Sequence, residues 1–242
     1  MRNVAVFGGS FNPVHWGHLL IAATAVDQFE LDQVIWVPTY RSPHKGESLE
    51  RFGHRLEMVR RAIADHPAFT ASDIDAHRQG VSYAIATLTD LQPLYPNSNW
   101  FWIIGIDAFQ TLPRWHKSEA LAAQCTWLVA PRSRQMEEWE REEVGESAGG
   151  TETREPRDAE NPIQNSQVNV QKSSNFPDSP LQICQRVAAS ANPPLYWHLL
   201  EMPKIEISSS LVRQACRDGR SIRYWVPEAV RLYILEFKLY VK

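Results

Sequence analysis

A strand, a glycine turn and a helix start are encoded at the beginning of this chain, and together they restrict the fold more than any other feature. The apolar run Val4–Phe7 ends in two glycines, and the turn Gly8–His18 reads Gly-Gly-Ser-Phe-Asn-Pro-Val-His-Trp-Gly-His before the apolar segment Leu19–Ala23. A strand that passes through a glycine turn into a helix presents backbone N–H groups to a phosphate. The pattern therefore predicts an α/β fold with an anion-binding site behind its first strand.

Short apolar runs alternate with amphipathic stretches over most of the chain. The runs predict strands at residues 3–7, 34–38, 68–72, 100–104, 126–130 and 195–199, and the spacing of apolar residues predicts helices at 17–29, 51–65, 81–91 and 117–123. This alternation is typical of right-handed βαβ crossovers, so we expect an α/β, Rossmann-like and mainly parallel sheet with helices on both faces. Such sheets bind ligands at the carboxyl ends of their strands, where the Gly8–His18 turn would lie.

One long segment, residues 132–180, differs from the rest in composition. It holds 11 acidic and 6 basic residues, and its net charge of -5, against -3 for the whole chain, leaves the remainder at +2. Because it has few apolar residues, it cannot bury enough surface to offset its ordering entropy. We therefore expect one domain formed by residues 1–131 and 181–242. The acidic, disordered insertion 132–180 would serve as a passive linker or as a partner-binding segment.

The C-terminal part is expected to be small and helical. A short helix is expected at 181–190, Ile205–Ile207 has the pattern of a strand end, and the serines that follow are an N-cap signal for a helix to about Cys216. Pro227 then opens a last amphipathic helix from Glu228 to about Tyr240. Its apolar face would carry Val230, Tyr233, Ile234 and Phe237.

Composition argues against several functional classes. A hydrophobic content of 43% is enough for a full core, and a net charge of -3 gives no global attraction to nucleic acid or to an anionic membrane. No apolar run reaches the roughly 18 residues that a transmembrane helix needs. The cysteines Cys125, Cys184 and Cys216 lack metal-ligand spacing, and the N-terminus does not resemble a signal peptide. We therefore expect reduced thiols in a cytoplasmic protein.

Two histidines at the expected helix start, His15 and His18, are the first candidates for chemistry. Two imidazoles there can stabilise charge that develops on a phosphoryl group, and Gly17 between them lets a ligand approach the backbone. Histidines three residues apart are otherwise common on helix surfaces. A zinc site is the rival function, but the HExxH spacing and third ligand of such sites are missing.

Three further clusters are candidates for phosphate or base binding. Ser208–Arg213 could cap a helix and fold an arginine over a phosphate, or it could be a plain N-cap with a solvated arginine. Arg41–Gly46 is a basic loop behind the second strand that could bind phosphate or be merely exposed. Behind a very apolar strand, Asp107 could hold a ribose hydroxyl, and Trp115, which precedes His116, could stack on a flat ring or belong to the core.

At these residues the chain resembles the nicotinate-nucleotide adenylyltransferases (nicotinic acid mononucleotide adenylyltransferases) of the nucleotidyltransferase superfamily. The family's opening motif GGxFxPxHxGH matches Gly8–His18, and its ISSxxxR motif matches Ile207–Arg213. Further matches are the PPHK-like loop at Ser42–Lys45, the Ser-Tyr segment at Ser82–Ala84, and the IIGxDxF and LxxWH blocks at Ile103–Phe109 and Leu112–His116. The resemblance spans residues 1–131 and 195–240 and leaves the insertion uncovered.

The resemblance implies that nicotinate mononucleotide and ATP give deamido-NAD and pyrophosphate, with no protein nucleophile. His15 and His18 would be the catalytic residues, because they would stabilise the transition state. The implied ATP site comprises Gly8, Gly9, Ser10, Phe11, His15, His18, Asp107, Ile207, Ser208, Ser209 and Arg213. The implied mononucleotide site comprises Ser10, Phe11, His44, Lys45, Ser82, Tyr83, Ala84 and Trp115, with Trp115 stacked on the pyridine ring. Mg²⁺ would bind through the ATP phosphates and water, so no protein ligands for it are expected.

Two positions depart from the family pattern. Ala84 stands where the family usually has threonine, and Ile106 stands where a small residue usually precedes the aspartate. Both bear on the acceptor, so nicotinamide mononucleotide or another phosphorylated acceptor is the alternative substrate. A non-catalytic nucleotide-binding protein of the same fold is the alternative class. Whether the chain forms a homo-oligomer is left open by the sequence.

Overall fold

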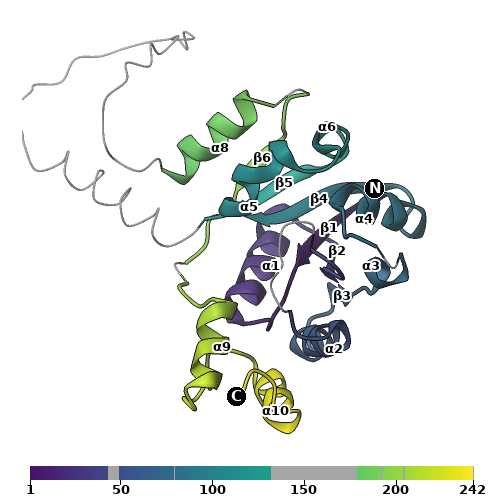
Figure 1. The fold of residues 1–242 in the computed structure, drawn as a ribbon. Coiled ribbons are helices and arrows are strands. Elements are labelled where there is room, and N and C mark those ends of the chain that lie inside the picture. The colour runs from purple at the N-terminus through teal and green to yellow at the C-terminus, as the bar shows by residue number, and fades with distance from the viewer. Residues whose placement is uncertain (43–48, 79, 132–178, 192, 204, 242) are drawn as a thin grey trace, which may run out of the picture.

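The computed structural model describes residues 1–42, 49–78, 80–131, 179–191, 193–203 and 205–241. A six-stranded sheet with parallel neighbours runs through it in the order β3-β2-β1-β4-β5-β6 (Figure 1). The strands are β1 (Arg2–Gly9), β2 (Gln33–Pro38), β3 (Phe69–Ala71), β4 (Ser98–Gly105), β5 (Thr126–Ala130) and β6 (Trp197–Leu199). All six predicted strands are present, and the predicted parallel, Rossmann-like sheet is confirmed.

Helices connect the strands and cover the sheet. They are α1 (Trp16–Phe29), α2 (Phe52–Ile63), α3 (Ile74–His77), α4 (Ala84–Leu91), α5 (Ile106–Thr111), α6 (Ser118–Ala122), α8 (Pro180–Ala189), α9 (Ser209–Arg217) and α10 (Glu228–Glu236), with the 3-10 turns η1 (Gln92–Leu94) and η2 (Leu112–Arg114). The predicted helices are present, although α4 begins at Ala84 and not at residue 81. The short helices α3 and α5 were not predicted, because neither is long enough to show a helical period.

The central strand β1 separates two core layers. Its side chains alternate between the two faces of the sheet, so Ala5 and Phe7 belong to one apolar cluster and Val4 and Val6 to the other. The first cluster receives buried residues from α1, α2, α9 and α10, and the second receives them from α4, α5, α6 and α8. Helices therefore cover both faces, as predicted.

The chain changes direction across the sheet between β1 and β4. β2 and β3 extend from one side of β1, while β4, β5 and β6 extend from the other. The β1–β4 ladder ends at the pair Phe7–Ile103, so Gly8 and Gly9 project beyond it while they still pair with β2. A crevice at this switch point is where sheets of this type bind ligands.

The C-terminal part corrects three expectations. Residues 205–207 form no strand with the described part of the sheet, and they lead directly to α9. α10 ends at Glu236, not near Tyr240, and Phe237 is 46% exposed, so it does not join the buried face. The chain then turns, because Lys238 and Tyr240 adopt φ values of 48° and 64°. This turn directs the last residues back toward the N-terminal half.

The predicted insertion lies almost wholly outside the described residues, so the single domain with its insertion stays a prediction. On its far side the expected short helix is present as α8, where Ser179 and Gln182 form a capping box. None of the helices in the described ranges has the length and apolar character that a bilayer crossing needs.

Candidate active site

The Gly8–His18 turn leaves β1 at the switch point and ends in the first turn of α1. His15 is the N-cap residue of α1 and is buried, while His18 lies one turn later and is half-buried. The two imidazole centroids are 3.7 Å apart. The His15 backbone N–H donates to Nδ1 of His18 at 3.2 Å, which fixes the second ring relative to the first. The turn therefore presents two adjacent, oriented imidazoles at a helix N-terminus.

Burial keeps both imidazoles neutral in the free protein. It lowers the pKa of His15 from 6.5 to about 4, and it lowers the pKa of His18 well below 6.5, where the nearby charge of His15 acts in the same direction. Nδ1 of His15 is buried and has no hydrogen-bond partner among the described residues. A bound phosphate would favour the protonated forms and could accept a hydrogen bond. The pair is thus suited to an anionic ligand.

Gly17 allows the histidine pair to pack this closely. A Cβ atom at this position would lie 3.0 Å from Nδ1 of His15 and 3.3 Å from Cγ2 of Ile205. A larger residue would have to displace the imidazole or the segment that leads into α9. The glycine is therefore required by the packing of side chains around the site.

The first turn of α9 lies against the same loop. Ser208 caps α9, with Oγ accepting from the backbone N–H of Leu211 at 3.3 Å, as its N-cap pattern predicts. Ser209 Oγ donates to the carbonyl of Pro13, and Nη1 of Arg213 donates to the carbonyl of Asn12, both at 2.8 Å. Two helix N-termini and one guanidinium thus surround the turn, although their sequences lie about 190 residues apart.

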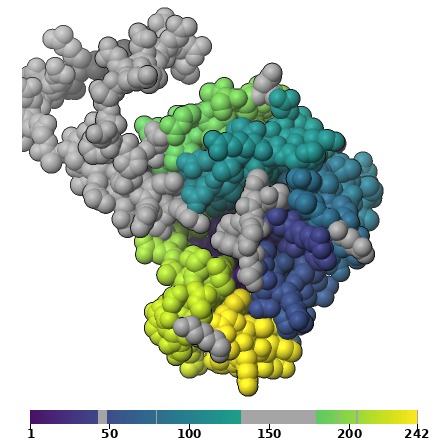
Figure 2. Space-filling model, viewed as in Figure 1, coloured from purple at the N-terminus to yellow at the C-terminus, as the bar shows by residue number. Residues whose placement is uncertain are grey.

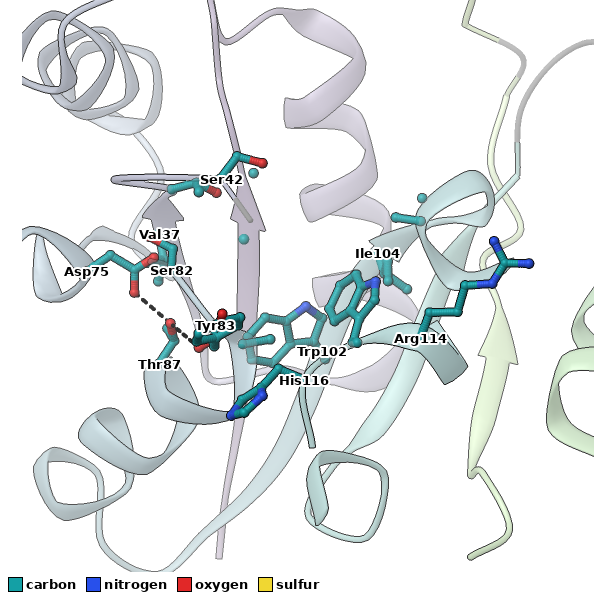
Figure 3. Close-up of a pocket in the computed structure, with 17 residues that line it drawn as sticks. Val37, Ser42, Asp75, Ser82, Tyr83, Thr87, Trp102, Ile104, Arg114 and His116 are labelled. Carbon is teal, nitrogen blue, oxygen red and sulfur yellow. Dashed lines mark hydrogen bonds between the residues drawn. The ribbon is translucent and has the colours of Figure 1, made fainter. Parts of the chain in front are cut away.

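A cavity of about 490 Å³ opens on the other side of the glycine turn (Figure 3). Its size is typical of a site for a small organic ligand. The predicted site residues that line it are Gly8, Gly9, Ser82, Tyr83, Ala84 and Trp115. The cavity shares Gly8 and Gly9 with the Gly8–His18 turn, so ligands on the two sides would meet at these glycines.

The N-terminus of α4 forms one wall of the cavity. Tyr83 is the N-cap residue, and its ring lies against His116 with centroids 4.4 Å apart. Thr87, one turn into α4, donates through Oγ1 to Oδ1 of the buried Asp75 at 2.6 Å, and Arg78 pairs with the same carboxylate. In Figure 3 Arg114 lies on the opposite side of the cavity from Asp75. The charge of Asp75 is thus balanced within the protein by Arg78, and the first residues of α4 line the cavity.

Several predicted site residues are not brought to the cavity. Its described lining includes neither Ser10, which is exposed, nor Phe11, which is 1% exposed and packs between Phe7, Trp36 and His18. The Phe11 side chain packs in the core, and the predicted role of Phe11 in the mononucleotide site stays a prediction. Asp107 is exposed in the first turn of α5, and Ile207 is half-buried ahead of α9. The predicted residues His44 and Lys45 lie outside the described residues.

Other residues of the cavity carry no signal in the sequence. Asp75 and Thr87 cannot be recognised from it, because α3 is too short to show a period and a threonine inside a helix is not distinctive. Arg114 and Trp102, which also line the cavity, were not proposed as site residues. Ile106 was expected to affect the choice of acceptor because of its size. It is fully buried in the second core cluster and does not line the cavity. It therefore does not restrict the ligand.

Comparisons with known proteins agree with this arrangement. Residues 6–215 match the family described as cytidylyltransferase-like. A protein of Trichormus variabilis named "Probable nicotinate-nucleotide adenylyltransferase" is 44% identical to this chain. The alignment covers 99% of this chain and 98% of the relative. One of the same name from Geobacter sulfurreducens is 37% identical, with 97% of this chain and 96% of the relative covered.

A solved structure shares the fold. The Plasmodium falciparum nicotinic acid mononucleotide adenylyltransferase complexed with NaAD has a TM-score of 0.66 at 17% identity, with 99% of this chain and 98% of that chain covered. At this identity the likeness supports the architecture of the sheet and its helices. The family itself follows from the curated relatives, whose identity extends over nearly the full length. This chain therefore belongs to the nicotinate-nucleotide adenylyltransferases within the cytidylyltransferase-like family.

Proposed function

We propose that this protein transfers the adenylyl group of ATP to nicotinate mononucleotide, giving deamido-NAD and pyrophosphate in NAD biosynthesis. The observation that carries the proposal is the position of the Gly8–Gly9 turn. One side of it faces the cavity, and the residues that follow it contact α9 through Ser209 and Arg213. A donor held by the two helix starts and an acceptor held in the cavity would meet at this turn.

The reaction needs no protein nucleophile. A phosphate oxygen of the mononucleotide attacks the α-phosphorus of ATP, the new P–O bond forms, and the bond to the β-phosphate breaks with release of pyrophosphate. Catalysis then depends on positioning and on stabilisation of the charge that develops on the phosphoryl oxygens. His15 and His18 supply this stabilisation, together with the backbone N–H groups at the start of α1.

On the donor side, α9 holds the triphosphate. Ser208 and Ser209 lie at its N-terminus and Arg213 lies one turn later. Arg213 donates one N–H group to the Asn12 carbonyl and one to Oγ of Ser210, and keeps the others for phosphate oxygens. Asp107, in the first turn of α5 just after β4, binds the ribose hydroxyls. The basic loop that contains His44 and Lys45 neutralises phosphate charge. These roles rest on the family motifs and on the positions of the described residues.

On the acceptor side, the start of α4 favours nicotinate over nicotinamide. Trp115 lines the cavity as an aromatic surface for the pyridine ring. The first N–H groups of α4 carry a partial positive charge, which stabilises a carboxylate more than a neutral amide. Ala84 removes a hydroxyl group from this wall but keeps its backbone N–H, so the preference for an acid is retained.

Mg²⁺ is the expected cofactor. Among the described residues no group of three histidine, cysteine or acidic side chains is arranged to hold a metal ion. The donors present around the turn are imidazoles, hydroxyls and a guanidinium, which fit phosphate oxygens and not a hard cation. Mg²⁺ would therefore be held by the phosphates and water, and when bound it neutralises part of the triphosphate charge.

An assay with purified protein tests the proposal. ATP and Mg²⁺ are offered with nicotinate mononucleotide or with nicotinamide mononucleotide, and pyrophosphate and the dinucleotide are measured. We expect kcat/KM to be at least tenfold higher with the nicotinate substrate. Turnover with nicotinamide mononucleotide alone would contradict the acceptor preference, and no pyrophosphate with either would indicate a non-catalytic nucleotide-binding protein.

A further inference from the structure

Asn12, inside the phosphate-binding turn, is bonded to three distant segments. It is 2% exposed. Its side-chain Oδ1 accepts from the hydroxyl of Tyr240 at 2.8 Å and from the backbone N–H of Glu50 at 3.3 Å. Its carbonyl accepts from Arg213 at 2.8 Å. One residue of the turn therefore joins the C-terminal segment, α9 and the chain that precedes α2.

Arg55 on α2 also donates a hydrogen bond to the Gly8–His18 turn. Arg55 is 1% exposed, and its guanidinium donates to three backbone carbonyls: Ser10 at 2.7 Å, Thr39 at 2.8 Å and Glu50 at 2.8 Å. Ser10 belongs to the turn, whereas Thr39 and Glu50 stand on either side of the basic loop Arg41–Gly46. A single side chain thus fixes the turn and both stems of that loop.

Burying polar side chains such as those of Arg55 and Tyr240 costs free energy unless they form hydrogen bonds. Burial lowers the pKa of Arg55, and its three acceptors are neutral carbonyls. Burial raises the pKa of Tyr240, so its phenol stays protonated and donates its hydrogen bond. Neither side chain lines the cavity or belongs to the histidine pair. Any effect on the reaction must therefore pass through the groups that they hold.

The irregular C-terminus is what brings Tyr240 to the turn. α10 stops at Glu236, and the positive φ values of Lys238 and Tyr240 reverse the chain. Figure 1 places the C-terminus beside α9 and α10, at the end of the molecule where α2 also lies. The strain of two non-glycine residues in the left-handed region is offset by bonds that include the one to Asn12.

We propose that Tyr240 and Arg55 are positioning residues of the adenylyl-transfer site, Tyr240 acting through Asn12 and Arg55 through the Ser10, Thr39 and Glu50 carbonyls. This rests on the proposed function. The turn carries His15 three residues after Asn12, so a shift of Asn12 moves the imidazole relative to the reacting phosphate. A displacement of about 1 Å at a reacting centre can cost roughly a hundredfold in rate. Both residues are expected to affect kcat more than the binding of either substrate.

Tyr240→Phe is the primary test, because it removes one hydroxyl and leaves the ring in place. Tyr233→Phe is its matched control, since Tyr233 also makes a hydrogen bond near the C-terminus, to Nδ1 of His54 at 2.8 Å, without contacting the turn. Each variant should lower Tm by about 2–4 °C. We expect kcat to fall about tenfold in Tyr240→Phe, with both KM values within about twofold, and to stay unchanged in Tyr233→Phe. Equal kcat values in the two variants would overturn the role of Tyr240.

Arg55→Lys tests the second residue, because lysine keeps the charge but cannot span three carbonyls. Its control is Arg60→Lys on the same helix, where Arg60 is half-exposed and lies 3.8 Å from Asp73. We expect at least a tenfold loss of kcat in Arg55→Lys and none in Arg60→Lys. Wild-type turnover in a folded Arg55→Lys protein would remove Arg55 from the proposal.

A measurement without substrate separates this inference from the proposed function. The ring nitrogens of His15 and His18 are observed by NMR in the free wild-type protein and in the two tyrosine variants. Tyr240→Phe should shift these signals, and Tyr233→Phe should not. If the wild type makes no deamido-NAD, the proposed function fails, while the NMR comparison still decides whether Tyr240 positions the histidines. Unshifted histidine signals in Tyr240→Phe would contradict the inference whatever the activity.

Discussion

His18 lies at the end of the Gly8–His18 turn, against aromatic residues of the core. Its ring stands edge-on to Phe11 at 5.1 Å and lies 6.1 Å from Phe7, while the tilted His15 ring lies 3.7 Å away. Such packing holds an imidazole in one orientation before any substrate arrives, which is what preorganised stabilisation of a transition state requires. The same burial lowers the pKa of His18 well below 6.5, which favours its neutral form.

Replacement of His18 by alanine should lower kcat by roughly a hundredfold or more, because one group that stabilises the transition state is lost. KM values should change much less, and circular dichroism should show an unchanged fold. His198→Ala is the control, since His198 is exposed on the edge strand β6. Steady-state kinetics on the three proteins decide the matter, and unchanged turnover in His18→Ala would remove His18 from the mechanism.

The lowered pKa of His15 predicts an acid-sensitive fold. The unfolded chain binds a proton at this position near pH 6.5, whereas the folded chain does so only near pH 4. The free energy of unfolding should therefore decrease as the pH falls from about 6.5 to about 4, by at most about 1.4 kcal/mol per pH unit for this group. Urea titrations at several pH values measure it. His15→Asn should show a shallower decrease, and an identical pH dependence in both proteins would contradict the assignment.

At the scale of elements, the turn, α1 and α9 form the site because α9 bonds to carbonyls of the turn. Those bonds use Ser209 and Arg213, which the sequence had marked as an N-cap cluster with an arginine one turn later. The local signals of both helix starts were therefore readable. That the starts of α1 and α9 lie side by side could not be read from local sequence, because the two helices are far apart in the chain. The family motifs implied that both bind ATP, and the bonds from Ser209 and Arg213 to the turn explain how they are held together.

The elements that could not be predicted lack a local signal. Arg55 sits in an amphipathic helix, where an arginine usually faces solvent, and its burial depends on the three carbonyls to which it donates. The reversal after α10 depends on positive φ at Lys238 and Tyr240, a conformation that sequence normally reserves for glycine or asparagine. In contrast, β5 occurs at the predicted residues because its apolar run is fully buried in a parallel sheet.

The acidic segment 132–180 is predicted to be dispensable for activity. Its composition indicates a passive linker, so replacement of residues 136–178 by a short glycine-serine linker should leave kcat and both KM values within about twofold of wild type. Activity assays and a thermal melt on the shortened protein measure this. A large loss of kcat with an intact fold would instead assign the segment a regulatory or partner-binding role.

In the whole molecule, the site is assembled from both ends of the sequence. The cavity is formed by residues that precede Lys117, whereas the proposed donor side uses α9 from the C-terminal part. The two core layers hold these parts separately, since α9 packs with α1 and α2 while α4 packs on the opposite face. Loss of one binding side should therefore leave the other able to bind its own ligand.

Thermal melts of two variants test this separation. Each substrate alone, at about 100 times its Kd, stabilises the folded state by about 2.7 kcal/mol, which raises Tm by roughly 5–10 °C for a chain of this size. Arg213→Met should lose the shift caused by Mg²⁺-ATP and keep that of nicotinate mononucleotide. Trp115→Ala should do the reverse, each variant being compared with its own melt without ligand. If both variants lose both shifts, the donor and acceptor do not occupy opposite sides of the turn, because only a shared binding site would make each ligand depend on both residues.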